Sequence, residues 1–356
     1  MNTRHYEARR EKARRLMHTV GLSALLITLD ANRFYLSGFE LRDPQSNESS
    51  GCLVLTQSGK DWLCTDPRYQ DAARRLWDED RIFIYRGNGM EQVNGLLKDQ
   101  VAGLIGFEAN NISVTAFEQV GDGLSMQRAD GMIEALRAIK EPEELACLEK
   151  SCSLNHRLME WVPGVLVPGR TESQVAWDIE QFFRNHGADG LAFSSIVAVD
   201  GNAALPHAEP GATRITDNCC VLVDAGCRLD RYCSDQTRTF WVGDAPHPQC
   251  VRDLDLIKQA QARAIALIRP GAAAVDIYAA AKEYLDSYGI GDLFTHSLGH
   301  GIGLQTHETP NLGFRSAAVL QAGMVFTVEP GVYRQGTRGL RWEYMVAVTE
   351  DGARVL

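Results

Sequence analysis

Three histidines and a glutamate fall within thirteen residues of the chain, in the segment HSLGHGIGLQTHE (296–308). His296 and His300 are four positions apart, a spacing that would place both imidazoles on one face of a helix, as in helical zinc motifs. The three glycines that interrupt the segment make a helix unfavourable, and the general-base glutamate of that zinc motif is replaced by a serine. For His296, His300 and His307 alike, metal ligation and a structural hydrogen-bonding role are both open at this point.

Four carboxylates lie in strand-like sequence elsewhere in the chain. They are Asp224 and Asp235 in VDAGCRLDRYCSD, Glu329 in MVFTVEPGVY and Glu343 in LRWEYMVAV. An odd separation on one strand would place Asp224 and Asp235 on opposite faces, but a hairpin turn at 226–231 would let them meet across a strand pair. Carboxylates in such apolar surroundings are expected to be buried, and a buried charge needs a partner. Arg238 or Arg341 would supply one ion pair, whereas four carboxylates require a cationic centre.

Four carboxylates and one imidazole form a hard, oxygen-rich ligand set, which favours Mn²⁺, Fe²⁺, Co²⁺ or Zn²⁺ over a thiolate zinc site. Their charge would balance two divalent ions, which in two-metal hydrolases hold a water between them. A rival site of Cys219, Cys220, Cys227 and Cys233 lacks the C-x₂-C spacing of zinc motifs, so we expect these thiols to fill the core. The GHGIG run is too weak a match to indicate a phosphate-binding loop.

The elements that must position these residues fall into two halves, and we place the boundary near residue 132, giving domains 1–131 and 132–356. Strands alternating with helices predict a small α/β domain in the first half. Its expected elements are helices over 1–18 and 69–80, strands over 22–28, 81–86 and 103–111, a turn with an aromatic segment over 30–39, and a hairpin over 51–66. The second half is expected to contain helices over 143–161, 172–187, 250–268 and 274–288, and strands over 194–199, 219–226, 237–243, 324–333 and 340–352.

Composition and charge argue against a nucleic-acid-binding protein and against a membrane-spanning one. The net charge of −10 argues against nucleic acid as a partner. No apolar run is long enough to span a membrane, and the basic segment from Arg4 to Arg15 carries two glutamates, so we expect a solvated helix there rather than a targeting peptide. Nine cysteines form no regular framework, and a reduced, cytoplasmic protein is the expectation.

In this order and context, the five candidate ligands resemble those of the M24 metallopeptidases, the pita-bread enzymes that include prolidase, aminopeptidase P and methionine aminopeptidase. The resemblance is carried by DAG…YCSDQTRT, HSLGHGIGL…HE, VEPGVY and RWE. In the first half, RRLMHTVGLSALLITLDANRFYLSGF, TDPRY and IGFE look like the N-terminal domain of the prolidase, aminopeptidase P and creatinase branch. The implied fold is an α/β N-terminal domain of creatinase/prolidase type followed by an α+β pita-bread catalytic domain.

The resemblance implies a role for each site residue. Asp224 would bind one divalent ion and His300 and Glu329 the other, with Asp235 and Glu343 bridging the two. Glu329 would also act as general base for a hydroxide held between the ions, with Mn²⁺ favoured and Co²⁺, Fe²⁺ or Zn²⁺ as alternatives. The residues expected on the substrate side are His207, His307 near the scissile carbonyl, His296 against the proline ring, and Arg341, which would also support the bridging carboxylates.

Two positions depart from the pattern of the family. Tyr344 follows Glu343 where relatives commonly carry an acidic residue, so the support of that ligand is expected to differ. Many prolidases carry an arginine after HExP that meets the C-terminal carboxylate of a dipeptide, whereas Asn311 stands there in this chain. Arg315 is a candidate replacement for that arginine.

The resulting prediction is a dinuclear metallopeptidase that cleaves the Xaa-Pro bond of short proline-containing peptides, either as an aminopeptidase or as a dipeptidase, and that forms a homodimer. Three alternatives remain: a creatinase-like hydrolase without metal, a metal-dependent hydrolase of a non-peptide amide, and a non-catalytic pita-bread binding protein.

Overall fold

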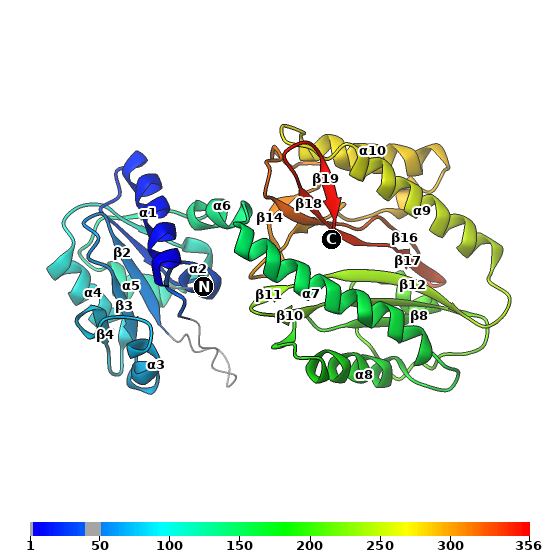
Figure 1. Cartoon of the computed structure of the whole chain (residues 1–356), viewed down its shortest axis with the longest axis horizontal. Coiled ribbons are helices and arrows are strands. Elements are labelled where there is room, and N and C mark those ends of the chain that lie inside the picture. The colour runs from blue at the N-terminus through cyan, green and yellow to red at the C-terminus, as the bar shows by residue number, and fades with distance from the viewer. Residues whose placement is uncertain (1–2, 40–50) are drawn as a thin grey trace. The chain divides into compact units, whose positions relative to one another are not determined.

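The structure, a computed structural model, describes residues 3–39 and 51–356, and the chain divides into two compact units, Met1–Arg137 and Ala138–Leu356 (Figure 1). The boundary expected near residue 132 falls at the first residue of helix α6 (Met132–Ala138). In the described part of the chain, no helix has both the length and the apolar character needed to cross a membrane.

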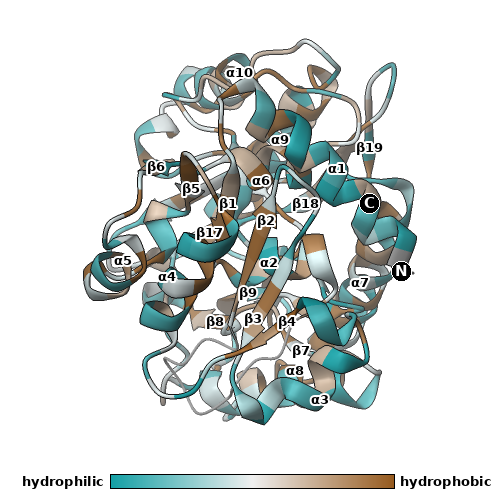
Figure 2. Cartoon of the chain, turned by 90° about the vertical axis from the view of Figure 1, so that its left-hand side faces the viewer, coloured by the Kyte–Doolittle hydropathy of each residue, from teal (hydrophilic) through white to brown (hydrophobic). Residues whose placement is uncertain are grey.

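The first unit is built on one six-stranded mixed sheet in the order β4-β3-β2-β1-β5-β6. Strand β1 pairs antiparallel with β2 and parallel with β5. The strands are β1 (Ala24–Ile27), β2 (Cys52–Thr56), β3 (Trp62–Thr65), β4 (Ile82–Ile84), β5 (Ile105–Phe107) and β6 (Met126–Arg128). The other helices are α1 (Thr3–Thr19), α2 (Asp30–Ser37), α3 (Gln70–Arg74), α4 (Gly89–Gln100) and α5 (Val114–Gly121). Coloured by hydropathy, β2 is largely hydrophobic and α1 largely hydrophilic (Figure 2).

The expectation that the arginines of α1 face solvent is wrong for two of them. Arg9 is fully buried, and its guanidinium lies 3.9 Å from the centre of the Tyr35 ring. Arg14 is also buried and forms an ion pair with Asp61. An aromatic face at Arg9 and a carboxylate at Arg14 compensate for the water that each guanidinium loses on burial.

Two further expectations in this unit need correction. The segment 30–39 forms helix α2 rather than a turn, and α2 ends at Gly38, whose φ of 74° closes it in the left-handed conformation. The helix expected over 69–80 is shorter, because α3 ends at Arg74. Tertiary burial of the aromatic face of α2 overrides the turn-like local sequence.

The second unit carries its strands in four small sheets, ordered β11-β10-β7, β12-β9-β8, β14-β13-β15-β18-β19 and β16-β17. The strands before the histidine-rich segment are β7 (Gly190–Leu191), β8 (Ile196–Val199), β9 (Cys219–Ala225), β10 (Cys227–Leu229), β11 (Tyr232–Cys233) and β12 (Gln236–Val242). Those that follow are β13 (His300–Gly301), β14 (Glu308–Asn311), β15 (Val325–Val328), β16 (Gly331–Arg334), β17 (Arg338–Arg341), β18 (Tyr344–Val348) and β19 (Ala353–Val355).

Two pairs of helices enclose these strands (Figure 1). Helices α7 (Pro142–Trp161) and α8 (Glu172–Asn185) share an apolar core with β8 and β9, whereas α9 (Pro248–Ala266) and α10 (Ala274–Ser287) share one with β15 to β18. All four were predicted from sequence periodicity, and α7 begins at Pro142 as its sequence indicates. The α+β expectation for this half is confirmed.

The two long strands expected over 324–333 and 340–352 are each interrupted. The first divides into β15 and β16 around Glu329 and Pro330, and the second region into β17 and β18 around Trp342 and Glu343. Proline has no N–H for a strand ladder, which explains the first break. Both breaks coincide with candidate metal ligands, so these carboxylates are not confined to the two faces of a regular sheet.

Candidate metal centre

A cavity of about 870 Å³ opens in the second unit, and nearly all of the predicted site residues line it. Its wall includes four of the five candidate ligands together with the two outer histidines, His296 and His307, and with His207 and Arg341. Glu343 lies beneath this wall and is 1% exposed. The cavity therefore brings together site residues that are up to 134 positions apart in the chain, from His207 to Arg341.

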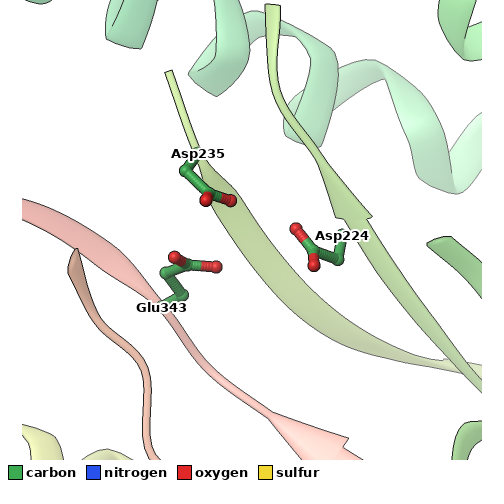
Figure 3. A group of neighbouring side chains, drawn as sticks. All are labelled: Asp224, Asp235 and Glu343. Atoms are coloured by element: carbon green, nitrogen blue, oxygen red, sulfur yellow. The ribbon is translucent and has the colours of Figure 1, made fainter. Parts of the chain in front are cut away.

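Three carboxylates form the centre of the site. Ligand oxygens of Asp224, Asp235 and Glu343 all lie within 4.8 Å of one another, and the three side chains point toward one another from separate strand segments (Figure 3). Asp224 lies in β9 opposite Thr237 of β12, and Asp235 immediately precedes β12. The two aspartates therefore meet at the end of the antiparallel pair β9–β12, as expected, with Asp235 two positions before the residue opposite Asp224.

Asp224 and Glu343 each have one carboxylate oxygen that accepts a hydrogen bond and one that accepts none. Asp224 Oδ2 accepts a hydrogen bond from Arg341 Nη2 at 2.6 Å, and Glu343 Oε2 accepts one from Thr237 Oγ1 at 2.6 Å. In contrast, Asp224 Oδ1 and Glu343 Oε1 are buried and have no hydrogen-bond partner among the described residues. Unpaired buried carboxylate oxygens are costly, and a divalent cation between them would remove that cost. The residues present therefore fit a metal.

His300 and Glu329 extend the group on one side. His300 Nε2 lies 3.4 Å from Glu329 Oε1 and 3.6 Å from Asp235 Oδ2. Its Nδ1 is 3.1 Å from the Gly301 carbonyl oxygen, to which it donates, and this leaves Nε2 with its lone pair toward the carboxylates. Thr327 Oγ1 donates to Glu329 Oε1 at 3.2 Å and so fixes that carboxylate.

The glycines beside His300 are required by close packing. A Cβ on Gly299 would lie 1.8 Å from the Thr327 carbonyl oxygen, and one on Gly301 would lie 2.2 Å from the Thr309 carbonyl oxygen. Only glycine lets the short strand β13 pass between β14 and β15 and bring His300 to the cavity.

The electrostatics match a cation site. Burial, and then the neighbouring carboxylates Glu343, Asp224 and Glu329, raise the pKa of Asp235. Burial also raises the pKa of Glu329 and of Glu343, with Glu329 and Asp224 adding to the shift at Glu343. Burial lowers the pKa of His300, which keeps its imidazole neutral and able to bind a metal.

Both ring nitrogens of His296 are hydrogen-bonded within the protein, unlike Nε2 of His300. Its Nδ1 donates to the Ser297 carbonyl oxygen at 2.7 Å, and its Nε2 is 3.0 Å from the Tyr333 hydroxyl. That hydroxyl accepts from Arg341 Nη1 at 2.8 Å and so donates its own proton to His296. The structure places His296 in a hydrogen-bonded chain at the edge of the group, with Phe294 packed edge-on against its ring at 5.1 Å.

His207 and His307 stand at the exposed side of the cavity. The rings of His307 and His300 are 4.1 Å apart, which places His307 beside the ligand group. Burial, followed by the nearby His300 and His207, lowers the pKa of His307, so this imidazole is neutral at pH 7 and can donate one hydrogen bond.

Tyr344, one of the two departures, takes part in an aromatic clamp. The Arg238 guanidinium lies 4.2 Å from the ring centre of Trp342 and 4.3 Å from that of Tyr344, and it donates to the Glu343 carbonyl oxygen. The two rings hold the Arg238 guanidinium by cation–π stacking. In relatives, an acidic residue at the position of Tyr344 would be available for an ion pair instead. Arg238 thereby supports the backbone of Glu343 rather than its carboxylate.

The second departure leaves a polar, uncharged position in the cavity wall. Asn311 lines the cavity, and its Oδ1 lies 3.3 Å from Ser297 Oγ. Arg315 is exposed, stacks on the Phe314 ring at 4.9 Å and is absent from the described wall of the cavity. The suggestion that Arg315 replaces the missing arginine is therefore not supported by its position.

Several residues that support the site were not predicted from the sequence. Thr237 and Thr327 donate hydroxyl hydrogen bonds to the ligands Glu343 and Glu329, and the Tyr333 hydroxyl links Arg341 to His296. An isolated threonine or tyrosine gives no recognisable signal in the sequence. Lys140 and Glu308 form a buried ion pair at 2.9 Å beside the cavity, with side-chain exposures of 1% and 4%. Glu308 directly follows His307, and this adjacency in the HETPN segment was the one available clue.

Comparisons with known proteins agree with this geometry. Residues 146–350 match the model for metallopeptidase family M24, and residues 9–139 match that for the creatinase/prolidase N-terminal domain. The chain is 30% identical over 349 residues to an Xaa-Pro dipeptidase of Pyrococcus furiosus, covering 98% of this chain and 97% of that protein. Among solved structures, an Xaa-Pro dipeptidase from Bacillus anthracis matches with a TM-score of 0.91 and 29% identity, covering 98% and 97% of the two chains. An X-Pro aminopeptidase from Thermotoga maritima matches with a TM-score of 0.84 and 28% identity, covering 96% and 97%.

Proposed function

The chain belongs to metallopeptidase family M24, with a creatinase/prolidase N-terminal domain, and from this premise we propose that it hydrolyses the Xaa-Pro bond of short peptides. The observation that carries the proposal is the group of buried carboxylates with two unpaired oxygens, set beside His300 at the base of the cavity. An ordinary ion-pair network would leave no such oxygens. The similarity to both Xaa-Pro dipeptidases and an X-Pro aminopeptidase supports the same reaction class.

Two divalent ions would be held by Asp224, Asp235, His300, Glu329 and Glu343. Mn²⁺ is our first choice, because the set is rich in oxygen and contains no thiolate, with Co²⁺, Fe²⁺ and Zn²⁺ as alternatives. When bound, such ions supply a hydroxide nucleophile at neutral pH and polarise the scissile carbonyl. Arg341 would keep Asp224 oriented, and Thr237 would do the same for Glu343.

The remaining residues would bind and orient the peptide. We assign His296 to the proline ring, because its imidazole lines the cavity and both of its ring nitrogens are already hydrogen-bonded within the protein. The side chains of His207 and His307 would donate hydrogen bonds to the carbonyl oxygen as charge develops on it. Glu329 would take the proton of the attacking water, since burial raises its pKa toward the range of a working base. An Xaa-Pro bond has no N–H to recognise, so ring shape and carbonyl contacts must supply the specificity.

We also propose that the protein acts in the cytoplasm as a homodimer. Its nine cysteines are all free thiols, eight of them buried, which is consistent with a reducing compartment. The four cysteines of the rival thiolate site lie in the core, and no cysteine joins the ligand group in the described chain. Sedimentation velocity of the purified protein tests the dimer directly.

The test of function is a hydrolysis assay with added Mn²⁺ on a Gly-Pro or Met-Pro dipeptide and on a tripeptide that begins Xaa-Pro, each against an EDTA control. We expect metal-dependent cleavage of at least one substrate. Cleavage of the tripeptide would indicate aminopeptidase P activity, and cleavage of the dipeptide alone would indicate prolidase activity. Two results would contradict the proposal: cleavage that persists in EDTA, or no cleavage of either peptide. They would favour the metal-free, non-peptide or binding alternatives.

A further inference from the structure

His207 lies in a segment that has little regular structure of its own. Between the end of β8 at Val199 and Gly211, the chain forms only a short 3-10 helix, Asp200–Ala204. No described residue hydrogen-bonds the His207 imidazole, so the path of the backbone must set its position. Arg341 Nη1 holds the Pro206 carbonyl oxygen at 3.2 Å, which is one local restraint beside His207.

Glu172, in the first turn of α8, contacts both ends of this segment. Its Oε1 accepts from the Val199 backbone N at 2.7 Å, and its Oε2 accepts from the Gly211 backbone N at 3.0 Å. The Asn202 side-chain amide donates to both oxygens, at 3.0 and 3.1 Å. One carboxylate therefore ties together the start, the middle and the end of the segment that carries His207.

The chemistry of this contact requires a carboxylate. Glu172 is fully buried, and no lysine or arginine of residues 3–39 and 51–356 forms an ion pair with it. Its charge is instead balanced by N–H donors and by the N-terminal end of α8, which favours a negative group. A glutamine of the same shape has only one oxygen, and its amide would turn a donor toward a backbone N–H.

We propose that Glu172 is a positioning residue for catalysis, which fastens the segment 199–211 and thereby places His207 against the substrate carbonyl. This inference rests on the proposed function, because it needs His207 to contact the substrate. Glu172 itself touches neither the substrate cavity nor any candidate metal ligand. It differs in this from Arg341 and Thr237, which act on the ligands directly.

The test compares Glu172→Gln with Glu180→Gln on the Xaa-Pro substrate that the wild type cleaves best. Glu180 lies on the same helix and binds Arg184 at 2.8 Å, away from the segment. A misplacement of His207 by about 1 Å would lower kcat/KM about 100-fold for Glu172→Gln, mainly through kcat. Glu180→Gln should stay within about twofold of the wild type, and the metal content should be unchanged in both.

A double-mutant cycle separates positioning from a general structural effect. If Glu172 acts through His207, adding Glu172→Gln to His207→Ala should lower kcat/KM by less than about threefold more. A full and independent loss in that background would overturn the proposal, as would a Glu172→Gln variant with wild-type kcat/KM. Should Glu172→Gln fail to fold, Asn202→Ala removes the central amide alone and is expected to show the same coupling with a smaller loss.

Hydrogen exchange gives a readout that does not depend on activity. The Val199 and Gly211 amides should exchange at least about tenfold faster in Glu172→Gln than in the wild type, and at the wild-type rate in Glu180→Gln. Unchanged exchange at these two amides in Glu172→Gln would show that Glu172 does not hold the segment 199–211 in place. If the wild type cleaves no Xaa-Pro peptide but the exchange prediction holds, the proposed function fails while the role of Glu172 in the segment stands.

Discussion

Removing one carboxylate from the centre should stabilise the metal-free protein while it destroys the metal site. Burial and the neighbouring carboxylates raise the pKa of Asp235 in the folded state above its ordinary value. The folded protein then binds more protons than the unfolded chain, so this group's contribution to stability is present at low pH and is lost as pH rises through the folded-state pKa. Asp235→Asn removes that loss and should raise the free energy of unfolding of the metal-free protein at pH 8.

The size of the effect follows from the spacing of the charges. At 4.8 Å, the limit within which the ligand oxygens of the group lie, two carboxylates in surroundings of effective dielectric constant about 20 repel each other by about 3 kcal/mol. In the wild type, a carboxylate of the group can take up a proton and relieve part of this repulsion. We therefore expect Asp235→Asn to raise the free energy of unfolding by about 1–3 kcal/mol at pH 8. At pH 5 the gain should shrink, because protonated Asp235 is neutral, as asparagine is.

Metal should reverse the order of stability. An ion at 1,000 times its dissociation constant stabilises the wild type by about 4.1 kcal/mol, which exceeds the gain expected for the variant, whereas the variant lacks one of the proposed bridging ligands and gains much less. Urea unfolding followed by circular dichroism, after dialysis against EDTA and again with Mn²⁺, measures both states. Asp217→Asn, an exposed aspartate before β9, is the matched control and should change neither. A metal-free Asp235→Asn protein less stable than the wild type at pH 8 would refute the reasoning.

Three further outcomes test separate parts of the site. His296→Ala should raise KM for proline peptides by about tenfold and leave metal content by mass spectrometry unchanged; lost metal would make His296 a ligand. Asn311→Arg should raise the dipeptide-to-tripeptide activity ratio by about tenfold, because it places a cation in the cavity wall, and an unchanged ratio would contradict that role. Lys140→Met removes the buried ammonium beside Glu308 and should cost about 3–5 kcal/mol in urea unfolding. Lys150→Met, which breaks an exposed pair, should cost less than about 1 kcal/mol, and equal losses would show that burial of the first pair does not matter.

The sequence alone predicted the elements whose side chains repeat with a clear period. The four long helices of the second unit and the hairpin over 51–66 were found this way. The strand-pair meeting of Asp224 and Asp235 followed from the glycine-containing loop between them. Helix α2 was mistaken for a turn, because its burial depends on strands distant in sequence. Helix α4 was missed altogether, although Asn88, a favoured N-cap residue, precedes it; the Asn88 side chain makes no capping hydrogen bond.

The candidate ligands were identifiable because each stands out against an apolar strand, but their arrangement was not. Periodicity treats 324–333 and 340–352 as continuous strands, in which Glu329 and Glu343 would occupy fixed faces. Their actual positions lie in the breaks, where the backbone changes sheet and the carboxylates turn inward. Such breaks depend on pairing with other strands, which a local pattern does not contain.

Thr237 shows why the supporting residues are harder to predict than the ligands. It pairs with Asp224 across the strand ladder, donates its hydroxyl proton to Glu343 Oε2, and accepts from Arg341 Nε at 2.9 Å. Arg341 in turn binds Asp224, so one hydroxyl completes a ring of contacts that orients a ligand in β9 and a ligand in the break between β17 and β18. Threonine is common in β-strands, so the sequence does not single out Thr237. Its supporting role follows from contacts that exist only in the folded structure. Because a hydroxyl both donates and accepts here, valine of the same shape would break the ring on both sides at once.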